Sequence, residues 1–323
     1  MKEIEIRPKK IFDKFVSLAT QDVKKFFNKK KKLIKCVACN KNGKFSFKKN
    51  GFSYCLCQNC KTLFVNPRPN EIDFSNYYQK SSSIKFLANN LYKKTQKLRR
   101  KKIWKPKAKI IAEKLKKNKF KNFNYVDIGG GYGIFAEEIS KYTKKKVTVI
   151  EPSPYMAEEC RKKKLNVVEK FLEKVEKNDL PNNKKCFTSF ELFEHLHNPS
   201  KFIRKLSKLM NKNDIFIFTT LSSTGLDIST LWKNSIAVSP PYHINFLNPQ
   251  SVYIFLQRHG FKIIDITTPG KIDIEILENN KNLITDKFWK NFLDTATQSE
   301  KSKMQDLISN LNLSSHMMVI CKK

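Results

Sequence analysis

Four glycines gather within five residues and could form a ligand-binding turn. Gly129, Gly130, Gly131 and Gly133 follow the apolar run 125–128, and apolar residues at helical spacing come after them. Glycine adopts positive φ without steric cost and leaves backbone N–H groups open to a ligand. The run therefore predicts a sharp turn between a strand and a helix that can receive a small molecule.

Two acidic residues frame this turn. Asp127 precedes it, and Glu151 ends the apolar run 147–150 about twenty residues later. A strand, a glycine turn, a helix and a second strand ending in an acid form a nucleotide site, where the acid binds ribose hydroxyls. The alternative is a glycine-rich turn in a Rossmann-like domain that binds a different nucleotide or none.

The glycine spacing is not that of the dinucleotide motif G-x-G-x-x-G. The order Asp127-x-Gly129-x-Gly131-x-Gly133 resembles the first motif of class I S-adenosylmethionine (SAM) methyltransferases. This resemblance implies SAM as the cofactor, bound by these four residues and by Glu151. The run also lacks the Gly-Lys-Ser/Thr ending of a P-loop, so ATP hydrolysis is not expected.

Four cysteines have the spacing of a metal site. Cys36-x-x-Cys39 and Cys57-x-x-Cys60 are two paired motifs separated by seventeen residues. Zinc prefers four such thiolates in a tetrahedron, so we expect a structural Zn²⁺ site with no open position for a substrate. Redox chemistry is the less favoured alternative. The other cysteines are expected to stay outside the site: Cys55, Cys160, Cys186 and Cys321.

A further motif follows the cysteines. The run Leu63-Phe-Val-Asn-Pro-Arg-Pro69 and the pair Tyr77-Tyr78 resemble the front end of a bacterial methyltransferase group with an N-terminal zinc ribbon. Members of that group often modify sugars or surface-glycan precursors. The resemblance implies a sugar or nucleotide-sugar acceptor and a role in polysaccharide biosynthesis. The sequence leaves open whether oxygen, nitrogen or carbon is methylated.

Two histidines are candidate catalytic bases. His195 follows Glu194 just after the strand predicted at 185–190, and histidine can take a proton from a hydroxyl near neutral pH. His243 lies in Pro240-Pro-Tyr-His-Ile-Asn-Phe246, which resembles a segment that roofs the acceptor pocket in the same group. As an alternative to catalysis, Glu194 and His195 could cap a helix by satisfying backbone groups. His243 could be a loop histidine that only hydrogen-bonds to the backbone. His197 is expected to face elsewhere, and the segment 313–316 is expected to serve architecture.

The elements that must position these residues alternate along the chain. Strands are expected near 123–128, 146–150, 185–190 and 214–220, then a helix at 248–259 and strands at 261–268 and 317–321. Alternating strands and helices predict a parallel sheet. The predicted fold class is α/β: a Rossmann-like seven-stranded methyltransferase sheet with a small N-terminal zinc ribbon. The predicted segments are a basic N-terminal helix (1–33), the ribbon (34–70), a helical connector or lid (71–115) and a methyltransferase domain (116–323) with acceptor-site elements in 221–323.

Charge gives a weaker indication of partners. The chain of 323 residues has a net charge of +35, with 57 lysines and only seven arginines. Because arginine is preferred for bidentate phosphate and base contacts, nucleic-acid binding is possible but not favoured, and codon bias is the preferred explanation. Residues 9–32 could bind weakly to an anionic membrane, or they could pack as a helix on their own domain. We favour packing on the domain. Without an apolar run of about 18 residues or a signal-peptide core, a cytoplasmic protein is expected.

These patterns together predict an enzyme. We expect SAM-dependent methyl transfer to a small acceptor, with a histidine as general base and zinc in a structural role. One alternative is an RNA methyltransferase that uses the ribbon and its lysines as a binding platform. Another is a non-catalytic scaffold in which the ribbon and the basic helix recruit a partner.

Overall fold

The computed structural model describes residues 3–28, 31–118, 120 and 122–323. Lys29 and Lys30, which belong to the predicted basic N-terminal segment, lie outside the described residues, as do residues 1, 2, 119 and 121. In the described part of the chain, no helix is both long and apolar enough to cross a membrane.

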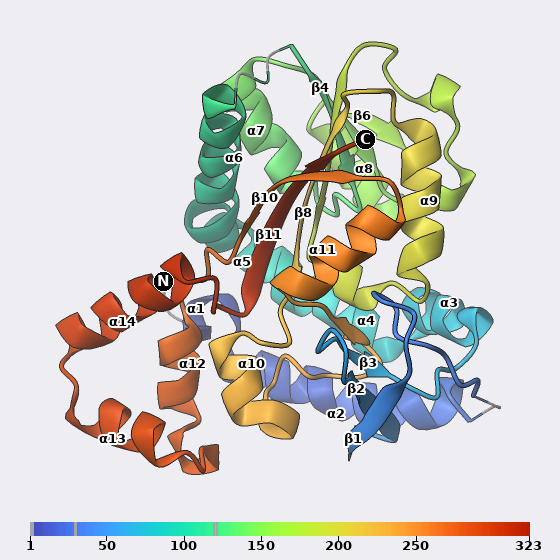
Figure 1. The fold of residues 1–323 in the computed structure, drawn as a ribbon. Coiled ribbons are helices and arrows are strands. Elements are labelled where there is room, and N and C mark those ends of the chain that lie inside the picture. Colours follow the sequence, from blue (N-terminus) through green and yellow to red (C-terminus); the bar gives the residue numbers. More distant parts are fainter. Residues whose placement is uncertain (1–2, 29–30, 119, 121) are drawn as a thin grey trace.

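The centre of the molecule is a seven-stranded sheet (Figure 1). The strands lie in the order β10 (Lys262–Thr267), β11 (His316–Lys322), β8 (Ile215–Leu221), β7 (Lys185–Phe190), β4 (Asn124–Ile128), β5 (Val147–Ile150) and β6 (Asn166–Val168). β11 runs antiparallel to β8 and β10, whereas the pairs from β8 to β6 are parallel. The predicted seven-stranded α/β sheet is confirmed, and the six strands expected from the sequence agree with the structure to within about two residues, whereas β6 was not expected.

Helices cover both faces of this sheet because its strands are apolar on both sides. Every residue of β8 is buried, with Ile215 and Ile217 facing one layer and Phe216 and Phe218 the other. The first layer contains α6 (Lys105–Lys117), α7 (Ile134–Thr143) and α8 (Pro154–Lys162). The second contains α9 (Pro199–Leu209) and α11 (Pro249–Arg258). Such burial is typical of a parallel sheet enclosed by crossover helices.

The cysteine-containing segment forms a second sheet. Strands β1 (Gly43–Lys49), β2 (Phe52–Cys57) and β3 (Leu63–Val65) are antiparallel, and Asn50 and Gly51 at the first hairpin both have positive φ. The fourth strand is β9 (Asn245–Phe246), from a distant part of the chain, and it pairs with β3 through Leu63–Phe246 and Phe64–Asn245. The ribbon predicted at residues 34–70 did not include the contribution of β9.

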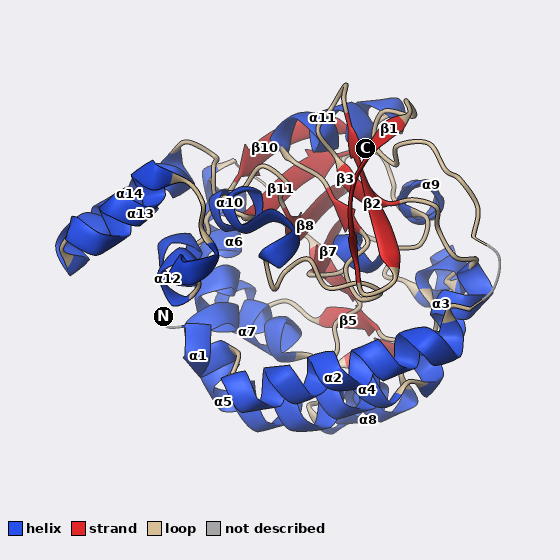
Figure 2. Cartoon of the chain, turned by 90° about the horizontal axis from the view of Figure 1, so that it is seen from below, coloured by secondary structure: helices blue, strands red, loops and turns tan. Residues whose placement is uncertain are grey.

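Further helices lie along the side of the molecule opposite α11 (Figure 2). They are α1 (Glu3–Ile6), α2 (Lys9–Phe26), α3 (Glu71–Lys80) and the first part of a continuous helical stretch from Ser82 to Lys117, whose last helix is α6 of the first layer. That stretch comprises α4 (Ser82–Phe86), the π-segment η1 (Leu87–Tyr92), α5 (Lys93–Arg99), the π-segment η2 (Arg100–Trp104) and α6. Pro106 follows η2 at the start of α6, where it removes one backbone donor. Figure 2 shows α2, α4 and α5 side by side along one side of the molecule.

The C-terminal helices form a separate group. They are α10 (Leu226–Leu231), α12 (Asp273–Asn279), α13 (Lys287–Thr295) and α14 (Gln298–Asn310), which share an apolar cluster of their own. Figure 1 shows α12, α13 and α14 together beside the main body, close to the N-terminus. The chain then returns to the sheet as β11, whose first residue, His316, lies opposite Leu221 at the carboxyl end of β8.

Candidate functional site

The glycine turn has the predicted backbone. Gly129, Gly131 and Gly133 have φ values of 69°, 55° and 67°, a left-handed conformation that residues with a side chain rarely adopt. A Cβ placed on Gly130 would come within 2.6 Å of Val149 and 2.9 Å of Asp127, so this position also requires glycine. At Gly131 the nearest atom would be 4.0 Å away. The turn is therefore tightly packed below and open at Gly131, which is the property a ligand-binding loop needs.

Glu151 connects the turn to the second strand. Its carboxylate accepts hydrogen bonds from the backbone N–H groups of Gly131 at 2.8 Å and Ser153 at 3.0 Å. The side chain is buried, and this burial raises the pKa of Glu151 although the two backbone donors lower it. Glu151 is thus held next to the open part of the loop, where a ribose could reach it.

Asp127 lies below the same turn. The side chain of Thr188 on the neighbouring strand β7 donates a 2.7 Å hydrogen bond to its carboxylate. Burial raises the pKa of Asp127 to about 7, although the Thr188 bond opposes the shift. Asp127 therefore supports the loop from inside, and its predicted contact with a cofactor stays a prediction.

The glycine turn adjoins the segment that carries the first candidate base. A Cβ on Gly129 would lie 3.3 Å from the side chain of Leu192, three residues before His195. The parallel strands β4, β5 and β7 all end at this edge of the sheet, with Asp127 opposite both Val149 and Thr188. Ligands of open α/β sheets bind outside the carboxyl ends of such strands. The cofactor candidates and the acceptor candidates therefore share one edge.

His195 and His243 come together across 48 residues of sequence. Their ring centroids are 4.8 Å apart. His195 donates from Nδ1 to the backbone carbonyl of Tyr242 at 2.6 Å, and His243 donates from Nδ1 to the carbonyl of Ala237 at 2.6 Å. These bonds fix the tautomer of each neutral ring and leave Nε2 as the nitrogen that can take a proton.

The protein that surrounds both rings keeps them neutral. Burial lowers the pKa of His195 to about 4, although the Tyr242 carbonyl favours the charged form. Burial lowers the pKa of His243 well below its ordinary value, and the charge of His195 adds to this effect. Both imidazoles are therefore unprotonated at neutral pH and available as proton acceptors.

Glu194 completes a compact group with the two histidines. One ligand atom from each of Glu194, His195 and His243 lies within 4.8 Å of the others. Glu194 is buried, and Thr220 donates to its carboxylate at 3.0 Å. Burial and the charge of Glu191 raise the pKa of Glu194 to about 8, so it is largely protonated at neutral pH. Such a group can exchange protons, and its donor set also suits a divalent cation.

Sequence reasoning missed a second charged group at the same edge. Glu191 follows β7 with a φ of 52°, which is rare for a residue with a side chain. It accepts hydrogen bonds from His316 Nε2 at 2.7 Å and Thr219 at 2.7 Å, and the ammonium of Lys107 lies 3.3 Å away. Burial would raise the pKa of Glu191, but the charges of His316 and Lys107 outweigh it and lower the pKa. The segment 313–316, expected to serve architecture, thus brings His316 to the site.

Two tyrosines also line the acceptor side. Tyr78, from the Tyr-Tyr pair, donates to the carbonyl of Tyr242 at 3.2 Å and lies 3.5 Å from Nδ1 of His195. The ring of Tyr242 packs on His195 with centroids 4.2 Å apart. Tyr242 could have been suspected because it precedes His243, whereas Tyr78 is brought in only by the packing of α3. His197 instead donates to the carbonyl of Pro69, which confirms that it faces elsewhere.

The arginine of the Asn-Pro-Arg-Pro run joins the second sheet to this site. Arg68 is buried and donates to the carbonyl of His197 at 2.6 Å and to the side chain of Asn245 at 2.7 Å. Asn245 belongs to β9, two residues after His243. One guanidinium thus ties the exit of the cysteine segment to the segments of both candidate bases.

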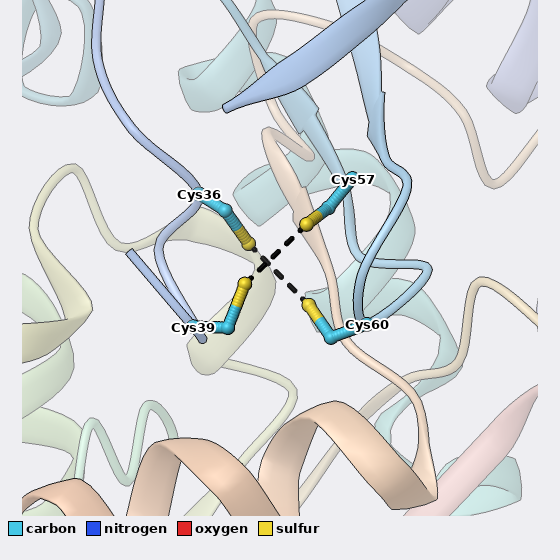
Figure 3. Close-up of side chains that lie close together, drawn as sticks. All are labelled: Cys36, Cys39, Cys57 and Cys60. Carbon is cyan, nitrogen blue, oxygen red and sulfur yellow. Dashed lines mark hydrogen bonds between the residues drawn. The ribbon is translucent and has the colours of Figure 1, made fainter. Parts of the chain in front are cut away.

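The four predicted cysteines converge on a point (Figure 3). The Sγ atoms of Cys36 and Cys60 are 3.5 Å apart, those of Cys39 and Cys57 are 3.4 Å apart, and all four lie within 4.8 Å of one another. A tetrahedral zinc site with bonds of about 2.3 Å has sulfurs about 3.8 Å apart, so the separations are close to those of a metal site. The two motifs also have the same local shape, because Asn40 and Lys61, each just after a motif, have positive φ.

The remaining cysteines stay apart from this group. Cys55 faces Asn66, and Cys160, Cys186 and Cys321 are buried in the main core. None of the eight cysteines forms a disulfide bond.

Comparisons with known proteins agree with the geometry. A sequence model of a family described as a methyltransferase domain matches residues 95–266. The mitochondrial ubiquinone biosynthesis O-methyltransferase of Dictyostelium discoideum is 24% identical over 182 residues, which cover 49% of this chain and 57% of that protein. The chain therefore matches little more than half the length of this curated relative.

Solved methyltransferase structures are similar to this chain. The plantazolicin methyltransferase BamL, crystallised with a triazolic desmethylPZN analog and SAH, matches 78% of this chain and 94% of its own with a TM-score of 0.50 and 12% identity. A SAM-dependent methyltransferase from Archaeoglobus fulgidus matches 67% of this chain and 94% of its own, with a TM-score of 0.44 and 19% identity.

Proposed function

The chain belongs to the methyltransferase domain family, and we propose that it transfers a methyl group from SAM to a small sugar-type acceptor. The SAM-dependent methyltransferase domain predicted from the glycine motif is confirmed by the family match. The observation that carries the proposal is the pair of neutral histidines His195 and His243, because the segment of His195 adjoins the glycine turn through Leu192 and Gly129.

The turn and its acid are proposed to hold the cofactor. Gly131 offers open space above the backbone, and Gly129 and Gly133 keep the left-handed conformation that the turn requires. Glu151 would accept hydrogen bonds from the ribose hydroxyls, while Asp127 would keep the loop in place from below. When bound, SAM supplies a methyl group that its sulfonium already activates.

The histidines are proposed to remove the acceptor's proton. Nε2 of His195 or His243 would take the proton of the acceptor hydroxyl when that oxygen receives the methyl group. The Nδ1 hydrogen bonds to Tyr242 and Ala237 hold each ring in position for this step. For a carbon acceptor next to a carbonyl, the same base would take the proton from carbon. The protein otherwise contributes alignment of the two reactants.

Zinc is proposed to be structural. The thiolates of Cys36, Cys39, Cys57 and Cys60 would satisfy all four positions of the ion, which leaves none for an acceptor. Elemental analysis of protein purified under reducing conditions should find one zinc per chain. Cys36→Ser should lose it, and Cys55→Ser, the matched control, should retain it. Full metal content in Cys36→Ser would contradict the assignment.

We assign one function to each of the predicted segments. Residues 34–70 would carry zinc, residues 116–323 would bind the cofactor, and residues 221–323 would supply His243 and its loop. Eight free thiols suit a reducing cytoplasm, where disulfides are rare.

A paired experiment tests this function. Calorimetry should show binding of SAM but not of NAD, and a panel of nucleotide-sugars should contain an acceptor that the enzyme methylates. His195→Ala and His243→Ala should lose turnover while still binding SAM. Methylation of structured RNA at a unique nucleotide, with no reaction on the sugar panel, would replace this proposal by the RNA alternative.

A further inference from the structure

Acidic residues are almost missing from one contiguous part of the chain. Residues 23–112 contain two, Glu71 and Asp73, against 25 lysines and arginines. Residues 113–323 contain 23 acidic residues against 34 lysines and arginines. A codon bias acts on the whole chain, whereas the scarcity of acidic residues is confined to residues 23–112.

The described part of residues 23–112, which we call the basic shell, includes buried strands of the small sheet and helices on one side of the molecule. It comprises the end of α2, the strands β1 to β3 and the helices α3 to α5 with the start of α6. The α2, α4 and α5 helices lie side by side (Figure 2), so their lysines share one side of the molecule. Exposed lysines on these three helices include Lys24, Lys25, Lys85, Lys94 and Lys97.

The exposed charge of the basic shell is carried by lysine. Of its three arginines, Arg68 is buried, Arg99 is half-buried, and Arg100 forms ion pairs with Glu137 and Glu138. Arginine is the side chain that reads base edges and grips phosphates with two hydrogen bonds. A surface of exposed lysines instead suits a partner whose negative charge is spread out, without hydrogen-bond acceptors at fixed positions.

Large apolar side chains are also exposed in the basic shell. Leu33 is 75% exposed and lies between Lys32 and Lys35 in the sequence, and Ile72 is 69% exposed on α3. The phosphates of a nucleic acid offer nothing to an aliphatic side chain, whereas a lipid headgroup region can bury it. We propose that the basic shell binds the surface of an anionic membrane.

This surface is coupled to the acceptor side of the molecule. The apolar side of α2 faces inward, and the ring of Phe15 packs on Tyr242 with centroids 5.7 Å apart. The apolar stripe of α2 is therefore used within the protein, and its lysines are what remain for a membrane. Binding through the shell would hold the Tyr242–His243 segment one helix away from the lipid surface. Membrane binding through exposed lysines does not depend on the identity of the acceptor.

Co-sedimentation with vesicles tests the proposal. The full-length protein is mixed with vesicles of neutral phosphatidylcholine, or with vesicles that also contain phosphatidylglycerol. One variant carries Lys24→Gln, Lys80→Gln, Lys85→Gln and Lys94→Gln in the basic shell. The matched control carries Lys145→Gln, Lys212→Gln, Lys290→Gln and Lys303→Gln, which are exposed lysines outside it. Thermal unfolding confirms that both variants are folded, and both lose the same net charge.

The expected result is binding to the anionic vesicles alone, which fades as salt is raised. The shell variant should bind on the order of a hundredfold more weakly than the unmodified protein, and the control less than threefold. Leu33→Ser with Ile72→Ser should weaken vesicle binding and leave binding to a structured RNA unchanged. Equal losses in the shell and control variants would overturn the proposal. So would tighter binding to RNA than to anionic vesicles at physiological salt, or equal binding to neutral vesicles.

Discussion

The hydroxyl of Tyr54 donates a 2.6 Å hydrogen bond to the backbone carbonyl of His243. Tyr54 lies on β2, three residues before the zinc candidate Cys57, whereas His243 is a candidate base of the methyltransferase site. The pairing of β3 with β9 and the contacts of Arg68 strengthen the same connection. The cysteine segment therefore supports the acceptor side of the site directly.

Tyr54→Phe tests this connection. The substitution keeps the buried ring and leaves the His243 carbonyl without its donor, which costs about 1–3 kcal/mol for a buried group. We expect turnover to fall about tenfold because the His243 loop shifts, while the affinity for SAM stays within about twofold. Steady-state kinetics and calorimetry measure the two quantities. Tyr253→Phe, at an exposed site on α11, is the control. Equal loss of SAM binding in Tyr54→Phe would show a general structural defect.

Glu151→Ala should weaken SAM binding. The change removes the acceptor for the ribose and also frees the N–H groups of Gly131 and Ser153. Hydrogen bonds to a charged group contribute about 1.5–3 kcal/mol, so we expect an affinity loss of about 10–100-fold. Glu151→Gln, which keeps one oxygen acceptor, should lose less. Calorimetry measures both variants, with Glu158→Ala on the exposed side of α8 as the control. Unchanged affinity in Glu151→Ala would remove this residue from the cofactor site.

The pH profile should report the burial of His195. A base must be unprotonated, so activity falls as the pH drops through its pKa, which lies at about 4 in the free protein. We expect kcat/KM to stay level from neutral pH down to about 5, well below the usual histidine range near 6.5. His195→Asn should lower kcat by about 10²–10⁴-fold, and His259→Asn at the end of α11 should leave the profile unchanged. An acidic limb centred near pH 6.5 would argue against His195 in its observed environment.

Glu194 should make the protein less stable as the pH rises. Its pKa increases from the ordinary 4.5 to about 8, so the folded state binds more protons than the unfolded state between these values. Stability is then fully present below about pH 4.5 and is lost as the pH rises through about 8. Glu194→Gln should remove about 3–5 kcal/mol of this decline. Urea unfolding of both proteins from pH 5 to 9 measures it. Parallel curves for the two proteins would indicate that Glu194 is ionised in the fold.

The sequence predicted most where local pattern and chemistry coincide. The glycine turn requires positive φ at Gly129, Gly131 and Gly133, and the apolar strands on either side fix its place in the sheet. The four cysteines are equally local, because each paired motif forms its own tight turn. His195 and His243 were proposed separately from motifs, and the structure brings them together.

What could not be predicted depends on contacts between distant segments. Glu191 and His316 are 125 residues apart and meet only because β11 inserts beside β8. Lys107 reaches the same group from a helix whose sequence looks merely basic. The strand β9 has two residues and no periodicity of its own, and it is defined by its pairing with β3. Such features follow from topology, which the order of residues along one segment does not reveal.

The shared sheet also limits how this protein can be divided. Because β9 completes a sheet whose other three strands come before residue 66, a fragment that begins after the cysteine segment would retain β9 without its neighbour. The backbone groups of Asn245 and the buried ring of Phe246 would then face water, and the loop between β8 and α11 would lose its anchor. The cysteine segment and the methyltransferase domain are thus one structural unit, although the cysteine segment comes earlier in the sequence. Exchanging it between relatives to alter specificity would require exchanging residues 232–248 with it.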